Sequence, residues 1–139
     1  MEHFAQYNHA IFALGAFVLI VMILNPLSAN IKTNEGVESG AMPPADYSSK
    51  SYRWSRAYMN AMEVSGPFVG ATVAAILAGG SPLWVNLLAS VFLVSRLIMA
   101  YVHIKGIGHK NMGPRTMIFA LGMFCICGLA LIAMIGALT

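Results

Sequence analysis

The chain has 139 residues, of which 58% are hydrophobic and only 9% are charged. A typical soluble domain has about 25% charged residues, so this composition excludes an ordinary soluble protein and a disordered chain. The net charge of +3 is small and dispersed along the chain, so it does not indicate a nucleic-acid partner. Helical spans of about 20 residues fit four times into this length with loops between them. The sequence therefore predicts an all-α fold in a single domain, residues 1–139, built as an integral membrane four-helix bundle.

Long apolar runs place the expected spans at residues 7–25, 57–78, 83–104 and 115–138. The first run ends where Pro26 follows it, and proline interrupts a helix. A cleavable signal peptide begins with basic residues, whereas residues 1–31 contain neither Lys nor Arg, so we expect the first run to remain as a span. Residues 26–56 are expected to form a long loop, and loops of that length are usually functional or mobile.

Basic residues gather on two of the three connections between spans. They are Lys32, Lys50, Arg53 and Arg56 in the segment 26–56, and Lys105, Lys110 and Arg115 after the third span. The remaining connection and both ends of the chain contain no Lys or Arg. Cytoplasmic loops of membrane proteins carry an excess of these residues. We therefore expect both basic connections in the cytoplasm and both termini outside.

Polar residues form a stripe along the start of the second span. At about 100° per residue, five residues share a sector of about 80°; they are Arg53, Arg56, Asn60, Glu63 and Pro67. Arg96 and His103 share a face of the third span in the same way. Together these groups predict a cationic cleft between helices that opens to the cytoplasm.

Glu63 and Arg96 are the charged residues expected deepest in the membrane. With a helical rise of about 1.5 Å per residue, they lie about 15 Å and about 13 Å from the cytoplasmic surface. An unpaired charge inside a membrane costs about 2.5 to 3.5 kcal/mol on insertion scales. We therefore expect Glu63 and Arg96 to interact, either directly or through one bound ligand.

The two cysteines, Cys125 and Cys127, lie two residues apart in the fourth span. On a helix they face different sides, so we expect neither a disulfide nor a metal site there. Both are expected to pack in the bundle or to face lipid.

The pattern Arg53-x-x-Arg56-Ala57-x-x-Asn60-x-x-Glu63, followed by Pro67, resembles the signature of the MAPEG family. These are the membrane-associated proteins in eicosanoid and glutathione metabolism, among them the microsomal glutathione transferases. The resemblance extends over the whole chain in length, number of spans and topology. It implies a homotrimer of four-helix subunits, with glutathione bound at each subunit interface near the cytoplasmic side.

The same resemblance implies roles for individual residues. The glutathione contacts that it implies are Arg53, Arg56, Asn60, Glu63, Arg96 and Tyr101. Arg115, at the start of the fourth span, matches the arginine that stabilises the glutathione thiolate, and His103 stands where many members have a tyrosine. We therefore take Arg115 and His103 as the catalytic candidates. Helical spacing alone directs Tyr101 away from the face that holds Arg96 and His103.

Glutathione carries two carboxylates, an ammonium and a thiol, and the residues match these groups. Arginines bind carboxylates through charge-assisted, often bidentate hydrogen bonds, and Glu63 can accept the ammonium. An arginine beside a helix N-terminus lowers the pKa of a thiol from its ordinary value of about 8.5. The expected activity is a membrane-bound glutathione transferase, with or without peroxidase activity. Its second substrate is expected to be a lipophilic electrophile or a lipid hydroperoxide that arrives through the membrane lipid.

Two alternatives from other functional classes remain open. The first is a non-catalytic, lipid-binding scaffold of the same family, whose cleft holds a ligand without activating it. The second is a small proton-coupled exporter, which would use a lone carboxylate such as Glu63 without a companion stripe of arginines. Thiol-dependent turnover distinguishes the enzyme from the scaffold, and proton-coupled efflux from vesicles would identify the exporter.

We predict that a membrane-impermeant thiol reagent labels an introduced Ser39→Cys only from the cytoplasmic side, because basic connections are retained there. Cys125 and Cys127 are first replaced by serine so that only the introduced thiol reacts. Ser81→Cys, on the connection without basic residues, is the matched control and should be labelled only from outside. Labelling of Ser39→Cys from the outer face of intact cells would reverse the predicted orientation.

Overall fold

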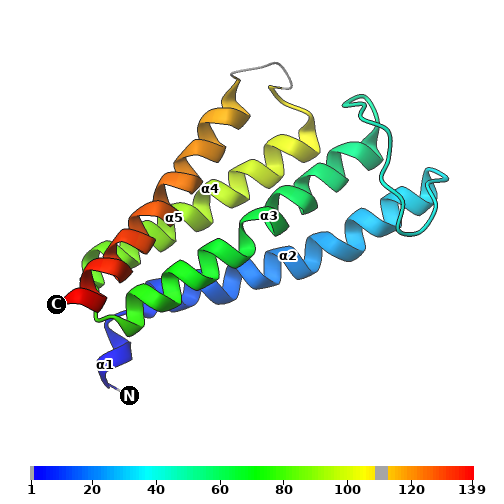
Figure 1. Ribbon diagram of the computed structural model, residues 1–139. Coiled ribbons are helices and arrows are strands. Elements are labelled where there is room, and N and C mark those ends of the chain that lie inside the picture. Colours follow the sequence, from blue (N-terminus) through cyan, green and yellow to red (C-terminus); the bar gives the residue numbers. More distant parts are fainter. Residues whose placement is uncertain (1, 109–112) are drawn as a thin grey trace.

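The computed structural model describes residues 2–108 and 113–139 as a bundle of helices (Figure 1). The long helices are α2 (Asn8–Asn34), α3 (Lys50–Leu77), α4 (Pro82–Lys105) and α5 (Pro114–Leu138), and a short α1 (Glu2–Ala5) precedes them. All four long helices are long and apolar enough to cross a membrane, and the described ranges contain no strand. The predicted all-α membrane fold with four spans is confirmed.

The helices extend further toward the basic segment than the sequence predicts. α2 does not end at Pro26 but continues to Asn34, and α3 begins at Lys50 instead of near residue 57. Ser28 on this extension is buried and lies 3.5 Å from Ser55 of α3, measured between the two hydroxyl oxygens. Packing between α2 and α3 therefore outweighs the hydrogen bond that the proline removes. The non-helical segment is residues 35–49 and not the whole of 26–56.

α3 and α4 are the central pair of the bundle, because they pack against each other and each also packs against α2 and α5. Figure 1 shows both termini at one end, with segment 35–49, the end of α4 and the start of α5 at the opposite end. We call this opposite end the basic end. Lys110, which contributed to the charge pattern, lies outside the described residues. The basic connections thus share one end, and its cytoplasmic orientation stays a prediction.

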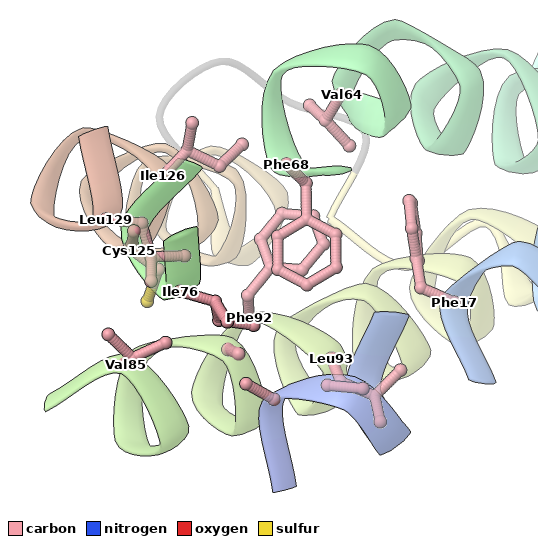
Figure 2. Packing of buried hydrophobic residues seen from close by; sticks show 14 of the residues in the cluster. Phe17, Val64, Phe68, Ile76, Val85, Phe92, Leu93, Cys125, Ile126 and Leu129 are labelled. Atoms are coloured by element: carbon pink, nitrogen blue, oxygen red, sulfur yellow. The ribbon is translucent and has the colours of Figure 1, made fainter. Parts of the chain in front are cut away.

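Three fully buried phenylalanines join α2, α3 and α4 near the middle of the bundle (Figure 2). The rings of Phe68 and Phe92 are stacked with centroids 3.8 Å apart, and Phe17 meets them edge-on at 5.5 Å and 5.2 Å. Such aromatic pairs contribute about 0.5 to 1.5 kcal/mol beyond the apolar area that they bury. This cluster fixes the three helices relative to one another below the basic end.

At the end that holds the termini, a side chain from α4 satisfies the start of α2. The first amides of a helix have no partner within the helix, and Tyr7 at this N-cap gives no side-chain cap. Asn86 instead accepts a hydrogen bond from the amide of Ala10 (2.9 Å) and donates one to the carbonyl of Gln6 (2.7 Å). The hydroxyl of Tyr7 donates to the carbonyl of Gly80 (2.6 Å). Long-range contacts therefore replace a local capping sequence.

At the basic end, the carboxylate of Glu35 ties the end of α2 to the start of α3. Its Oε2 accepts hydrogen bonds from the amide of Ser51 (2.9 Å) and from the hydroxyl of Ser49 (3.3 Å). The same Ser49 hydroxyl accepts from the amide of Tyr52 (3.3 Å) and so caps α3. Both ends of segment 35–49 are therefore held at one point.

We predict that Glu35 makes the stability of the bundle depend on pH. Hydrogen bonds from the hydroxyl and then the amide of Ser51 hold the pKa of Glu35 below its ordinary value. Because the folded protein favours the ionised carboxylate, this stabilisation is complete above the unfolded-state pKa and is lost as the pH falls through the lowered one. Glu35→Gln should lower the Tm at neutral pH and weaken its decline toward acid, measured by thermal unfolding in detergent.

Glu38→Gln is the matched control, since Glu38 is an exposed carboxylate on the same segment. It should leave both the Tm and its pH profile close to those of the wild type. If Glu35→Gln also gives a curve that parallels the wild type from neutral to acid pH, the Glu35 carboxylate does not hold α2 to α3.

Candidate functional site

Five of the residues predicted for the site separate into two groups by their burial. Asn60, Arg96 and His103 are buried inside the bundle. Arg56 and Glu63 lie on the outward face of α3, where their side chains are 30% and 48% exposed. The stripe on α3 therefore lies along the edge of the packed bundle, and its two sides have different surroundings.

Arg96 is 3% exposed and joins α3, α4 and α5. One terminal nitrogen donates to the side-chain oxygen of Asn60 (3.3 Å), and the other donates to the carbonyl of Ile118 (3.0 Å). Its Nε donates to the hydroxyl of Ser95 (3.3 Å). A Cβ atom at Gly122 of α5 would collide with the guanidinium. Glycine at that position therefore makes the space that the buried cation occupies.

The expected direct pair between Glu63 and Arg96 is wrong, whereas their contact through one bound ligand stays a prediction. Glu63 instead pairs with Arg56 on the same helix, at 3.8 Å between carboxylate oxygen and guanidinium nitrogen, while Arg96 binds Asn60. Asn60 and Glu63 are separated by about 60° around the helix axis. α4 packs against the Asn60 side of the stripe, so Glu63 points outward although its depth matches that of Arg96.

The pair also bears on the exporter alternative. A proton-coupled exporter of the expected kind uses a lone buried carboxylate, whereas Glu63 is half exposed and has Arg56 as its partner. The arrangement of Glu63 does not favour that function.

Arg53 binds backbone carbonyls at the point where three segments meet. Its Nε donates to Ile104 at the end of α4 (3.0 Å), and Nη1 donates to Tyr47 (2.8 Å) and Ser48 (2.7 Å) in segment 35–49. The last carbonyls of a helix lack partners within it, so Arg53 satisfies one of them while holding the segment down. Position 106 requires glycine for two reasons. Its φ of 69° is unfavourable for residues with a side chain, and a Cβ atom there would lie 2.8 Å from the Arg53 Cδ.

Arg115 and His103 each retain a buried nitrogen without a hydrogen-bond partner in the described ranges, namely Nη1 of Arg115 and Nδ1 of His103. The Nε of Arg115 donates to the carbonyl of Gly108 (2.8 Å), and its Cζ lies 4.2 Å from the centroid of the Tyr47 ring. Buried polar atoms are nearly always satisfied in proteins, so each of these two atoms needs a partner that the described ranges do not supply, and a polar ligand or water could be that partner.

Segment 35–49 carries a contact to the site that sequence analysis missed. Tyr47 packs on Arg115, and together with Asp46, Lys105 and Gly106 it lines a hollow of about 520 Å³ at the basic end. A loop has no periodicity that would assign a face to Tyr47. The only available signal was an aromatic residue between Pro44 and the serines that precede α3.

Tyr101 lies apart from this cluster. Its side chain is 57% exposed on α4, and its ring is 6.0 Å from the ammonium of Lys105. Helical spacing had already directed it away from Arg96 and His103. On α5, Cys125 is buried and Cys127 is exposed, so the two thiols face different sides as expected.

We predict that Arg96 is energetically coupled to Asn60 and not to Glu63. In a double-mutant cycle with Arg96→Met and Asn60→Leu, the coupling in the free energy of unfolding should be about 0.5 to 3 kcal/mol, the range for side chains in contact. The control cycle with Arg96→Met and Glu63→Gln should be additive within about 0.5 kcal/mol. Chemical unfolding in mixed detergent measures both. If the control cycle shows coupling and the first cycle is additive, Arg96 interacts with Glu63, as their matched depth predicts.

The comparisons with known proteins agree with the resemblance noted in the sequence. The MAPEG family model matches residues 9–135, which is nearly the whole chain and includes the four long helices except the first residue of α2 and the last three residues of α5. Searches of curated proteins and of solved structures found no match. The family match takes in the polar stripe of α3, Arg96 and His103 on α4, and Arg115 on α5. The chain belongs to the MAPEG family.

Proposed function

We propose that this protein is a membrane-bound glutathione transferase in which Arg115 stabilises the glutathione thiolate. The observation that carries the proposal is the pair of buried, unpartnered nitrogens on Arg115 and His103 among the described residues. In a MAPEG chain, whose family includes glutathione transferases, a buried guanidinium N–H at a helix start that no described residue binds is suited to an anionic sulfur.

The chemistry assigned to Arg115 is electrostatic. It is the second residue of α5, so its charge and the N-terminal dipole of that helix both favour an anion. Each unit by which the thiol pKa falls corresponds to about 1.36 kcal/mol in favour of the thiolate. The hydrogen bond from Nε to Gly108 leaves Nη1 to donate to the sulfur. His103, whose Nδ1 has no partner among the residues that the structure describes, is the second group proposed to contact the sulfur or an anion that develops on the electrophile.

The remaining residues divide between binding and positioning. Arg56 and Glu63 are accessible, so we propose that they bind a carboxylate and the ammonium of glutathione. The donors of Arg53 and Arg96 already serve the chain itself, and we propose that these residues hold the binding elements in place. Asn60 acts with Arg96. Tyr101, exposed on α4, has no part in this assignment.

The exposed face of α3 supports a homotrimer as part of the same proposal. Glu63 is ten residues from Arg53, or about 15 Å along the helix, and an ion pair open to lipid at such depth is costly. A Cβ atom at Gly66 or at Gly70 on the same helix would meet no atom within 4 Å, so this face is open within the subunit. A neighbouring copy on this face would shield Arg56 and Glu63 from lipid and close the glutathione site.

An apolar groove between α4 and α5 suits the lipophilic substrate. It measures about 260 Å³ and is lined by apolar side chains together with Ser90 and Ser95. The hydroxyl of Ser95 accepts a hydrogen bond from Arg96, so the groove borders the polar cluster inside the bundle. We propose that an electrophile or a lipid hydroperoxide reaches the cytoplasmic site along such a lipid-facing surface.

The test compares purified wild-type protein with Arg115→Ala, and with Lys105→Ala as a control that removes another cation from the same end. Arg115→Ala should raise the pH at which glutathione thiolate absorbance appears by about one unit and lower turnover about ten-fold. Glutathione affinity, measured by calorimetry, should change much less, because the sulfur is a minor part of the ligand. Lys105→Ala should behave like the wild type.

Full conjugation activity with an unshifted thiolate titration in Arg115→Ala would remove Arg115 from the mechanism. Tight glutathione binding by the wild type with no turnover of any electrophile or hydroperoxide would identify the lipid-binding scaffold instead. Before the assay, the mass of the detergent-solubilised assembly is measured, and we expect three subunits.

A further inference from the structure

The phenol ring of Tyr47 lies over the guanidinium of Arg115, with 4.2 Å between the ring centroid and Cζ. An arginine within about 6 Å of an aromatic centroid is attracted to the ring face, and this distance is well inside that limit. Tyr47 comes from segment 35–49, whereas Arg115 begins α5. The contact therefore joins two parts of the chain that are distant in sequence, directly on the residue proposed to bind the sulfur.

Tyr47 is held in this position from two sides. Its ring meets that of Tyr52 on α3 edge-on, with centroids 5.0 Å apart, and its carbonyl accepts a hydrogen bond from Arg53 (2.8 Å). The segment itself is fixed at both ends through Glu35 and Ser49. The ring is therefore part of a built structure that includes α3, and its place over Arg115 does not depend on a freely moving loop.

The ring of Tyr47 and the carbonyl of Gly108 both restrict the orientation of the Arg115 guanidinium. The ring covers a face of the guanidinium, Nε donates to Gly108, and Nη1 stays buried without a partner in the described part of the chain. A donor that is already oriented and shielded from water stabilises a developing anion more strongly than a mobile, hydrated one.

We propose that Tyr47 is a positioning residue that holds Arg115 ready for the thiolate of glutathione. It acts through its ring face on the guanidinium and not through its hydroxyl. This inference rests on the proposed transferase function, and it assigns a residue of segment 35–49 to the activation of the sulfur.

The experiment compares Tyr47→Leu, which keeps apolar bulk but removes the ring, with Tyr47→Phe, which keeps the ring and removes the hydroxyl. Tyr47→Leu should raise the pH of thiolate formation by about half a unit and lower kcat about three-fold, corresponding to a cation–π contact at a partly exposed site. KM for glutathione should change little. Tyr47→Phe should have the pH of thiolate formation and the kcat of the wild type. Met42→Leu, at an exposed position of the same segment, is the control for a general effect of the loop.

A second measurement does not depend on glutathione. The rate at which phenylglyoxal modifies Arg115, followed by peptide mass spectrometry, should rise in Tyr47→Leu and stay at the wild-type level in Tyr47→Phe and Met42→Leu. A rise confined to Tyr47→Leu supports the contact even if the transferase proposal fails. Unchanged modification in Tyr47→Leu overturns the inference.

The two proposals can be separated by their failures. If Arg115→Ala shifts the thiolate titration and Tyr47→Leu does not, Tyr47 has no positioning role and the transferase proposal stands. If Tyr47→Phe lowers kcat and raises the pH of thiolate formation as much as Tyr47→Leu does, the hydroxyl is responsible and the ring mechanism is wrong. If neither Arg115→Ala nor Tyr47→Leu moves the titration, Arg115 does not stabilise the thiolate, and absence of turnover by the wild type would overturn the transferase function itself.

Discussion

The need to satisfy a buried arginine constrains the rest of this bundle. Arg96 lies among apolar helices, and its hydrogen bonds reach Asn60 on α3 and the Ile118 carbonyl on α5. The rings of Phe92 and Phe119 lie 5.4 Å and 5.7 Å from its Cζ. Because an unsatisfied charge would be very costly at this depth, α3, α4 and α5 can meet only in a register that supplies these partners. That register also brings the starts of α3 and α5 to the end of α4, where the candidate site lies.

Segment 35–49 is the second determinant of the site. Glu35 and Ser49 fix its two ends, Arg53 binds its backbone near the end of α4, and Tyr47 covers Arg115. Arg53, to which the sequence assigns a part in ligand binding, thus also shapes the protein around the ligand. Arg53 uses two of its side-chain nitrogens for this structural role, since Nε and Nη1 both donate to backbone carbonyls.

The sequence predicts the fold well because helical periodicity and apolar length are local properties. They identify the four spans, the polar stripe on α3 and the shared end of the basic connections. They do not show which side of a polar stripe packs against a neighbouring helix. Matched depth therefore predicts Glu63 as the partner of Arg96, whereas packing makes Asn60 its partner. The Asn86 cap on α2 and the Tyr47 contact were also beyond prediction, because both join residues that are distant in sequence. The continuation of α2 past Pro26 depends likewise on packing against α3.

The length of the helices bears on how the protein sits in its membrane. α2 has 27 residues and α3 has 28, so each is about 40 Å long, whereas the hydrocarbon layer of a bilayer is about 30 Å thick. Lys32 lies in the last turn of α2 and Lys50 begins α3, so a surplus at the basic end would place segment 35–49 level with the lipid headgroups. A thicker bilayer would draw segment 35–49 toward the acyl chains, and each Å of hydrophobic mismatch would cost fractions of a kcal/mol. Bilayer thickness and headgroup charge would therefore act on the geometry around Arg115 without any ligand being present.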